Sequence, residues 1–287
     1  MYRRELLKGL SAVGASVALS SCAPKRIRAN IPGVTCLPRV QVSTDRITRS
    51  ICGLRPYRPS GFVVRAEKLN DTLVVHNYGH GGAGITLSWG TAELAVDLGA
   101  PGHVGPVAVV GCGVVGLSTA RLLQDSGFAV KIYAKDLPPN TTSNVAGGWW
   151  FPVSLSEPQF RTPAFEDQLL KAAKFAFERY QIMMGWRYGV RWSRSYMVNN
   201  AGFTETGYYG KQSVLRPMMP EFRDLAEGEN PFPGYQYVRQ FDAMLIEPPI
   251  YLAALMQDFH LAGGTIEVRE FHSAADLAAL PQKLVFN

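Results

Sequence analysis

The sequence is poor in cysteine. Its 287 residues include four, at Cys22, Cys36, Cys52 and Cys112, and no two of them form a Cys-x-x-Cys pair. A zinc site built from such pairs is therefore excluded. Cys36 and Cys52 either pair in an oxidising compartment or remain two separate thiols.

Long apolar runs and an excess of charge are also missing from the body of the chain. Beyond residue 30 no apolar run is long enough to form a membrane helix. The net charge is +6, but six basic residues and one acid among the first 29 residues carry +5 of it. The body is therefore nearly neutral, and nucleic acid is not an expected partner.

The N-terminal segment has the features of a targeting sequence. Arg3-Arg4 precedes a short, weakly apolar run, and Leu19-Ser20-Ser21-Cys22 follows it. Residues 1–22 resemble a twin-arginine export signal that ends in a bacterial lipobox, and residues 23–38 form a Pro- and Arg-rich tether. We expect export to the periplasmic face of a bacterial membrane, with a lipid anchor at Cys22. The alternative is an ordinary basic tail on a cytoplasmic protein.

The remaining sequence, 47% hydrophobic and 18% charged over the whole chain, has the pattern of a globular α/β protein. Residue content and spacing predict strands at 40–51, 61–65, 72–75, 107–110, 129–133, 265–268 and 284–286. Helices are predicted at 85–98, 114–126, from Thr162 to about residue 184, at about 252–262 and at 273–280. Residues 186–237 show no clear period and are expected to form irregular strands and loops.

A glycine-rich turn lies between the predicted strand at 107–110 and the predicted helix that follows. The run Gly111-Cys112-Gly113-Val114-Val115-Gly116 is a G-x-G-x-x-G motif, in which the glycines permit a tight turn and the helix N-terminus offers free N–H groups to a diphosphate. Asp136, after the next strand, is the candidate for binding a ribose. The motif predicts a dinucleotide but does not distinguish FAD from NAD.

Two further stretches add polar and small residues of the kind that bind cofactors. The first is residues 140–152, where Thr141, Thr142 and Ser143 supply hydroxyls and Gly148-Trp149 follows a small-residue turn. The second is residues 76–89, with the sequence HNYGHGGAGITLSW. His76 and His80 in it stand four residues apart, but the intervening glycines disfavour a helix and no third ligand is near, so hydrogen-bonded structural roles are expected rather than a metal site.

These stretches, together with residues 53–59 (GLRPYRP), closely resemble the D-amino-acid oxidase and D-aspartate oxidase family of FAD-dependent oxidoreductases. The resemblance implies FAD, an amino-acid substrate and oxidative deamination. It implies that Arg55 pairs with the substrate carboxylate and that the carbonyl oxygen of Gly82 accepts a hydrogen bond from the amine. It also implies that Gly81, Gly82, Gly84, Ile85 and Thr86 face the flavin.

The resemblance suggests a domain plan. Residues 39–150 would form a Rossmann-type FAD-binding domain, with the block 51–98 placed ahead of the βαβ unit at 106–150. Residues 151–250 would form mainly a mixed-sheet substrate domain, and residues 251–287 would return to the first domain, which remains incomplete.

The sequence departs from the family pattern in three ways. The 51–98 block is C-terminal in the family, so the chain resembles a circular permutation joined at residues 99–106. Lys135 stands where the family has its ribose-binding acid. The family also continues, beyond the region that matches residue 287, into strands bearing pocket tyrosines. Two alternatives therefore accompany the oxidase hypothesis: another flavin amine oxidase or dehydrogenase, similar to glycine or sarcosine oxidase, or a catalytically inactive truncated lipoprotein.

Overall fold

The computed structural model describes residues 37–38, 40–152 and 154–287. The expected export signal, the lipobox at Cys22 and the thiol of Cys36 lie outside the described residues, so the lipid anchor and the pairing of Cys36 with Cys52 stay predictions. Cys52 itself is exposed. Among the described residues, no helix combines the length and apolar character needed to cross a bilayer.

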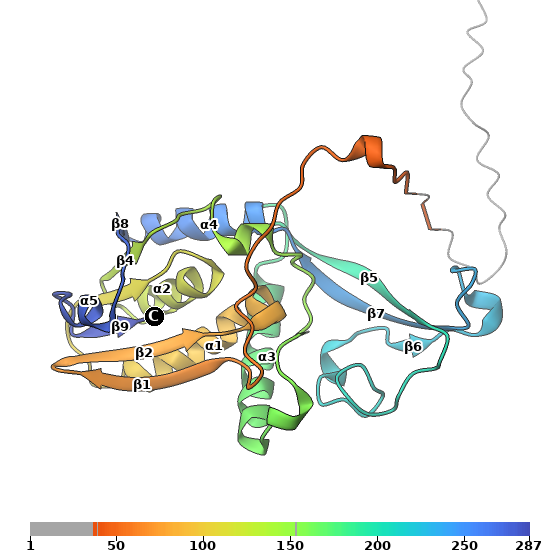
Figure 1. Ribbon diagram of the computed structural model, residues 1–287, viewed down its shortest axis with the longest axis horizontal. Coiled ribbons are helices and arrows are strands. Elements are labelled where there is room, and N and C mark those ends of the chain that lie inside the picture. Colours follow the sequence, from red (N-terminus) through yellow and green to blue (C-terminus); the bar gives the residue numbers. More distant parts are fainter. Residues whose placement is uncertain (1–36, 39, 153) are drawn as a thin grey trace, which may run out of the picture.

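A six-stranded sheet forms one half of the molecule (Figure 1). Its strands, in spatial order, are β1 (Val63–Leu69), β2 (Thr72–Tyr78), β9 (Leu284–Phe286), β3 (Val107–Val110), β4 (Val130–Ala134) and β8 (Thr265–Val268). All neighbours are parallel except the β1–β2 hairpin at one edge. The central strands are short and apolar because helices cover both faces, as is usual for parallel sheets.

Successive side chains of a strand point to opposite faces of the sheet, and different helices cover the two faces. Helices α1 (Gly84–Gly99), α2 (Val114–Asp125) and α4 (Pro248–Leu261) belong to the larger core, which includes Val75 and Val109. The neighbouring residues Val74 and Ala108 point to the opposite face and pack against the short helix α5 (Ala274–Ala278). The unit β3–α2–β4 is the predicted Rossmann-type βαβ unit.

A smaller sheet forms the other half, with the order β5 (Val190–Asn199), β7 (Tyr237–Ile246) and β6 (Arg223–Asp224). Helix α3 (Pro163–Ile182) stands between the two sheets (Figure 1). Its Phe177 contacts Trp192 of β5, with 5.9 Å between ring centroids. Thr162 caps its N-terminus as predicted, because the side-chain oxygen accepts a hydrogen bond from the Phe165 N–H at 3.2 Å.

The structure confirms the α/β class and most predicted elements, and it corrects three points. The mixed sheet is the six-stranded one, whereas both strand pairs of the smaller sheet are antiparallel. Residues 40–51 form no strand but an exposed segment with one 3-10 turn at Thr44–Arg46, because the described residues place no neighbouring strand beside them. Within the stretch expected to be irregular, β5 is a regular ten-residue strand in register with β7.

Candidate functional site

The site lies where the order of the parallel strands reverses. From β3 the sheet continues through β4 and β8 on one side and through β9 and β2 on the other. Ligands of open α/β sheets bind at such a switch point, beyond the carboxyl ends of the strands. The glycine turn that begins at Gly111 follows β3, and the turn that leads into α1 follows β2. Both predicted glycine-rich stretches therefore meet at one edge.

The first pocket surrounds the N-terminus of α2 and has a volume of about 260 Å³. Gly116 permits the turn to close, because a Cβ on this residue would collide with the carbonyl oxygen of Gly111. Ser143 Oγ accepts a hydrogen bond from the Val114 N–H at 3.0 Å. Within the described residues the N–H groups of Val115 and Gly116 have no acceptor, as expected at a helix N-terminus. This pocket can bind an anion such as a phosphate.

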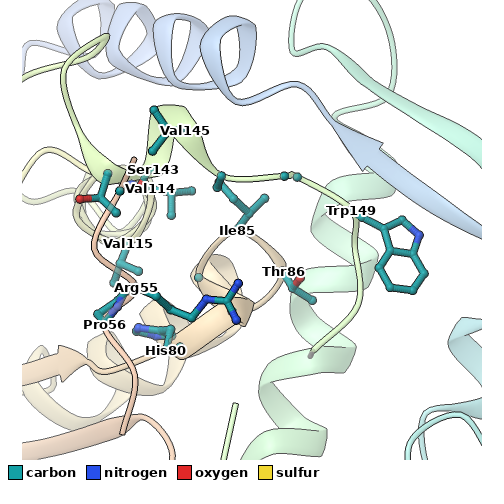
Figure 2. Close-up of a pocket in the computed structure, with 18 residues that line it drawn as sticks. Arg55, Pro56, His80, Ile85, Thr86, Val114, Val115, Ser143, Val145 and Trp149 are labelled. Atoms are coloured by element: carbon teal, nitrogen blue, oxygen red, sulfur yellow. Dashed lines mark hydrogen bonds between the residues drawn. The ribbon is translucent and has the colours of Figure 1, made fainter. Parts of the chain in front are cut away.

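A second pocket, of about 290 Å³, adjoins the first and shares Val114, Val115 and Ser143 with it (Figure 2). Its other walls are the segment that carries Arg55, the turn before α1 and the stretch after residue 141. The predicted residues that line one or both pockets are Arg55, Gly81, Gly82, Gly84, Ile85, Thr86, Gly111, Gly113, Val114, Val115, Gly116, Thr142, Ser143, Gly148 and Trp149.

Arg55 supplies positive charge to the second pocket. Figure 2 shows its guanidinium extending into the pocket toward Ile85 and Thr86. No Asp or Glu lines either pocket, and no described residue forms an ion pair with Arg55. The pocket is open to solvent, so the side chain is exposed as well as directed inward. A planar guanidinium without a protein partner can bind a carboxylate through two parallel hydrogen bonds.

Backbone hydrogen bonds hold the turn that precedes α1 against the segment of Arg55 and against the segment that contains Ser154. The Gly81 N–H donates to the Pro56 carbonyl oxygen at 3.0 Å, and the Gly82 N–H donates to the Ser154 carbonyl oxygen at 3.1 Å. Arg55 and Gly82 therefore line one pocket, although Arg55 precedes β1 and Gly82 follows β2. This arrangement is what the carboxylate and amine roles inferred from the resemblance require.

His80 lines the same pocket but is not suited to act as a base. Its Nε2 lies 2.8 Å from Thr91 Oγ1, and its ring stacks on Phe62 with centroids 5.8 Å apart. Burial lowers the pKa of His80 to about 4, so the ring is neutral near pH 7. The structural role expected for His80 agrees with these contacts.

Thr86 and Trp149 connect the pocket to the rest of the fold. The Thr86 hydroxyl donates to the Phe151 carbonyl oxygen at 3.1 Å and lies 3.2 Å from the Phe151 N–H, so it holds this segment against α1. The indole of Trp149 turns away from Arg55 in Figure 2, and its Nε1 donates to Ser195 Oγ of β5 at 2.9 Å. Gly148 adopts a φ of +67°, where a side chain would collide with the Ile246 carbonyl oxygen of β7.

Two predicted residues line neither pocket. Asp136 is exposed beyond β4, and the Thr141 hydroxyl donates to Asn144 Oδ1 at 2.8 Å. Lys135 forms an ion pair with Glu270 at 2.6 Å, and this pairing raises the pKa of Lys135. The structure therefore leaves the ribose contact of Asp136 as a prediction.

Other lining residues were missed in the sequence. They include Asn77 and Thr119 in the first pocket and Val145 in the second, whereas Ala146 and Gly147 belong to the small-residue turn that was expected to lie against the flat ring. Asn77 was hidden because the predicted strand ended at residue 75, whereas β2 runs through Tyr78. Its position at the carboxyl end of a parallel strand is the signal that would have identified it.

Comparison with known proteins extends these observations. A model of the FAD dependent oxidoreductase family, DAO, matches residues 24–98 and 106–277. The unmatched residues 99–105 comprise the last residue of α1 and most of the short connection to β3.

Curated relatives match parts of the chain. A D-amino-acid oxidase of Rubrobacter xylanophilus is 33% identical over 171 residues, which are 59% of this chain and 48% of the relative. A D-aspartate oxidase of Cryptococcus neoformans is 53% identical over 53 residues, 17% of this chain and 13% of the relative. The chain spans about half the length of the first of these relatives.

Among solved structures, the FAD-bound L-alpha-glycerophosphate oxidase of Mycoplasma pneumoniae has a TM-score of 0.41 at 17% identity, over 56% of this chain and 44% of that one. Iminodiacetate oxidase of Chelativorans sp. BNC1 has a TM-score of 0.38 at 15% identity, over 56% of this chain and 46% of that one.

The residues of the two joined pockets fit a flavin nucleotide. The unpaired amides at the α2 N-terminus suit a diphosphate, and the adjoining pocket, lined by small residues, leaves room for a flat ring. The family model covers every residue of both pockets except Phe286 and Asn287. The chain therefore belongs to the DAO family of FAD-dependent oxidoreductases, for which a flavin cofactor is implied.

Proposed function

We propose that this protein binds FAD and oxidises D-amino acids to 2-oxo acids, with release of ammonia and hydrogen peroxide. The reaction consumes one amino acid, one oxygen molecule and one water. The observation that carries the proposal is the position of Arg55, a cation without an acidic partner among the described residues, in the same pocket as the turn that precedes α1.

The roles of the residues follow from this position. The Arg55 guanidinium binds the substrate carboxylate, and the Gly82 carbonyl oxygen accepts a hydrogen bond from the amine. Two such contacts fix the direction in which the Cα–H bond points. Bound FAD would supply the two-electron oxidation by accepting a hydride from Cα.

No side-chain base is assigned to the reaction. A substrate whose amine arrives neutral needs no base. His80 forms a hydrogen bond with Thr91, and its lowered pKa makes it a weak proton acceptor. The N-terminal end of α1 lines the pocket at Gly84 and Ile85, and its positive dipole end stabilises negative charge there. The protein contributes chiefly orientation and electrostatics.

The spectrum of the purified protein tests the proposal. Acid extracts should contain FAD and no nicotinamide nucleotide. A mixture of D-amino acids added without oxygen should bleach the visible flavin bands, while the matched L-amino acids should not. Admission of oxygen should restore the bands and produce one hydrogen peroxide per substrate.

The other outcomes separate the competing functions. Bleaching by glycine or sarcosine alone would assign the protein to another class of amine oxidase. Reduction without formation of peroxide would indicate a dehydrogenase with a different electron acceptor. A colourless protein that takes up no flavin would overturn the proposal and favour the inactive lipoprotein.

We also propose export and a lipid anchor at Cys22, supported by Arg3-Arg4 and by the lipobox that ends at this cysteine. The wild-type protein should fractionate with membranes as a lipid-modified form, and Cys22→Ala should abolish the modification. Arg3→Lys with Arg4→Lys should retain precursor in the cytoplasm. Identical, unmodified cytosolic protein in all variants would contradict the anchor.

A further inference from the structure

Asn77 has an unexplained buried carboxamide beside the α2 N-terminus. The residue is 5% exposed, and neither its Nδ2 nor its Oδ1 has a hydrogen-bond partner among the described residues. It lines the first pocket together with the Gly111–Gly116 turn. Nothing in the oxidase roles above uses it.

The sheet fixes where this side chain points. Asn77 lies two residues beyond Val75 on β2, so both face the side of the sheet covered by α1 and α2. Its backbone N–H donates to the Asn287 carbonyl oxygen at 2.7 Å, and the residue pairs with Val64 of β1. The carboxamide has no partner among the described residues.

A core role does not account for an asparagine at this position. Central strands of covered parallel sheets are normally apolar, and an unpaired buried amide is unfavourable. The other buried polar groups of the pocket are engaged. Thr119 Oγ1 donates to the Val115 carbonyl oxygen at 2.9 Å, and Ser143 Oγ accepts from the Val114 N–H. The carboxamide of Asn77 and the amides of Val115 and Gly116 are left to bind a ligand.

These groups define the chemistry of that ligand. Two free N–H groups at the positive end of a helix favour an anionic oxygen, and Asn Nδ2 is a further donor. Asn Oδ1 is an acceptor, which suits a hydroxyl adjoining the anion. A diphosphate flanked by sugar hydroxyls provides both groups.

We propose that Asn77 binds the diphosphate portion of FAD, with Nδ2 donating to a phosphate oxygen and Oδ1 accepting from a neighbouring sugar hydroxyl. This role rests on FAD being the cofactor. It makes Asn77 a cofactor-binding residue contributed by the strand outside the βαβ unit.

The test uses full-length apoprotein titrated with FAD, with flavin fluorescence as the readout. Asn77→Leu removes both hydrogen bonds at nearly constant volume, and Asn77→Asp replaces the donor by a negative charge. We expect the Kd for FAD to rise on the order of 10-fold in the Leu variant and further in the Asp variant, whose carboxylate repels the phosphate. The matched control, Ser118→Ala, removes another buried polar group without a partner among the described residues, but one that lines neither pocket, and should leave the Kd unchanged.

The stability of the apoprotein separates a cofactor contact from a structural one. Asn77→Leu should leave the urea midpoint of the apoprotein unchanged or raise it, because an unpaired polar group is removed. A Kd equal to that of wild type in both variants overturns the Asn77 role while the oxidase proposal stands. A lower urea midpoint in the Leu variant with an unchanged Kd also overturns it. A wild-type protein that binds no FAD overturns both proposals.

Discussion

The two sheets depend on different interactions. In the six-stranded sheet, Val107 of β3 and Val285 of β9 are fully buried, and helices cover both faces. In the three-stranded sheet, β7 is mostly buried, but most residues of β5 are at least partly exposed, and charged pairs join its strands, such as Arg194 with Asp242 at 2.9 Å. The first half is thus stabilised by apolar burial between layers, and the second depends more on particular partners across strands.

The close approach of α1 and α3 gives the largest expected effect. A Cβ on Gly90 would collide with the carbonyl oxygen of Ala172, which is backbone and cannot move alone. Gly90→Val should therefore separate the two helices and destabilise the protein by several kcal/mol, on the order of 4 or more. Circular dichroism and expression of soluble protein measure the loss. Gly102→Val, where a Cβ meets nothing within 4 Å but φ is +76°, is the control for strain alone. Equal stability of the two variants would contradict this prediction, because it would show that α1 and α3 can move apart at Gly90 without a large loss of stability.

His80 makes the nucleotide-binding half sensitive to acid. Its folded pKa is about 4, below the ordinary value of 6.5, so the unfolded chain binds the proton more tightly. The stability contribution is complete above pH 6.5 and is lost as the pH falls toward 4, by about 3 kcal/mol for this shift. Urea unfolding at pH 7.5, 5.5 and 4.5 should show a steeper loss in wild type than in His80→Asn, which keeps a polar partner for Thr91. Parallel pH profiles would contradict the assignment.

Arg55 should matter for turnover and not for folding, because no described residue pairs with it. Arg55→Ala should lower kcat/KM for D-amino acids about 10²-fold or more through loss of a bidentate carboxylate contact. Arg55→Lys keeps the charge but loses the two parallel N–H donors of the guanidinium, so its kcat/KM should also fall. Flavin content and the urea midpoint should match wild type in both variants. If the wild-type protein is active, unchanged kinetics of Arg55→Ala would show that Arg55 does not bind the substrate.

The same contrast explains which features could be predicted from the sequence. The turn Gly111–Gly116, the helix after it and the position of Arg55 beside a pocket could be predicted because local apolar period, glycine spacing and family motifs specify them. The strand β5 was missed because its partner β7 lies some 40 residues further on and its side chains alternate little in polarity. The prediction of a strand at 40–51 was wrong, because apolar content does not form a sheet when no neighbouring strand lies beside it.

Arg239 tests the role of charge in the three-stranded half. It is 1% exposed, and its guanidinium donates to both carboxylate oxygens of Asp224, at 2.6 and 2.9 Å, and to the Tyr209 carbonyl oxygen at 2.7 Å. Hydrogen bonding from Arg239 lowers the pKa of Asp224. Arg239→Met should cost about 2 kcal/mol, less than a fully buried pair would, because the Asp224 side chain is 38% exposed.

The acid dependence of that variant gives the second measurement. The folded pKa of Asp224 is depressed, so its contribution is present above its unfolded pKa and lost as the pH falls through the folded value. Arg239→Met should lose this acid-sensitive part, whereas Arg194→Met, at a more exposed pair, should change it little. A methionine variant as stable as wild type would mean that apolar burial suffices in this half as well.

The N-cap of α3 gives the smallest effect and joins the two halves. Thr162 accepts a hydrogen bond from the Phe165 N–H, and α3 packs against α1 on one side and against Trp192 of β5 on the other. Thr162→Ala should cost about 1 kcal/mol in the free energy of unfolding, and Thr162→Ser, which keeps the oxygen, should cost less than half of that. Because α3 contacts α1 of one half and β5 of the other, the urea midpoint should fall with the slope m unchanged. A smaller m, or two separate transitions, would show that the halves unfold independently and that α3 belongs to one of them only.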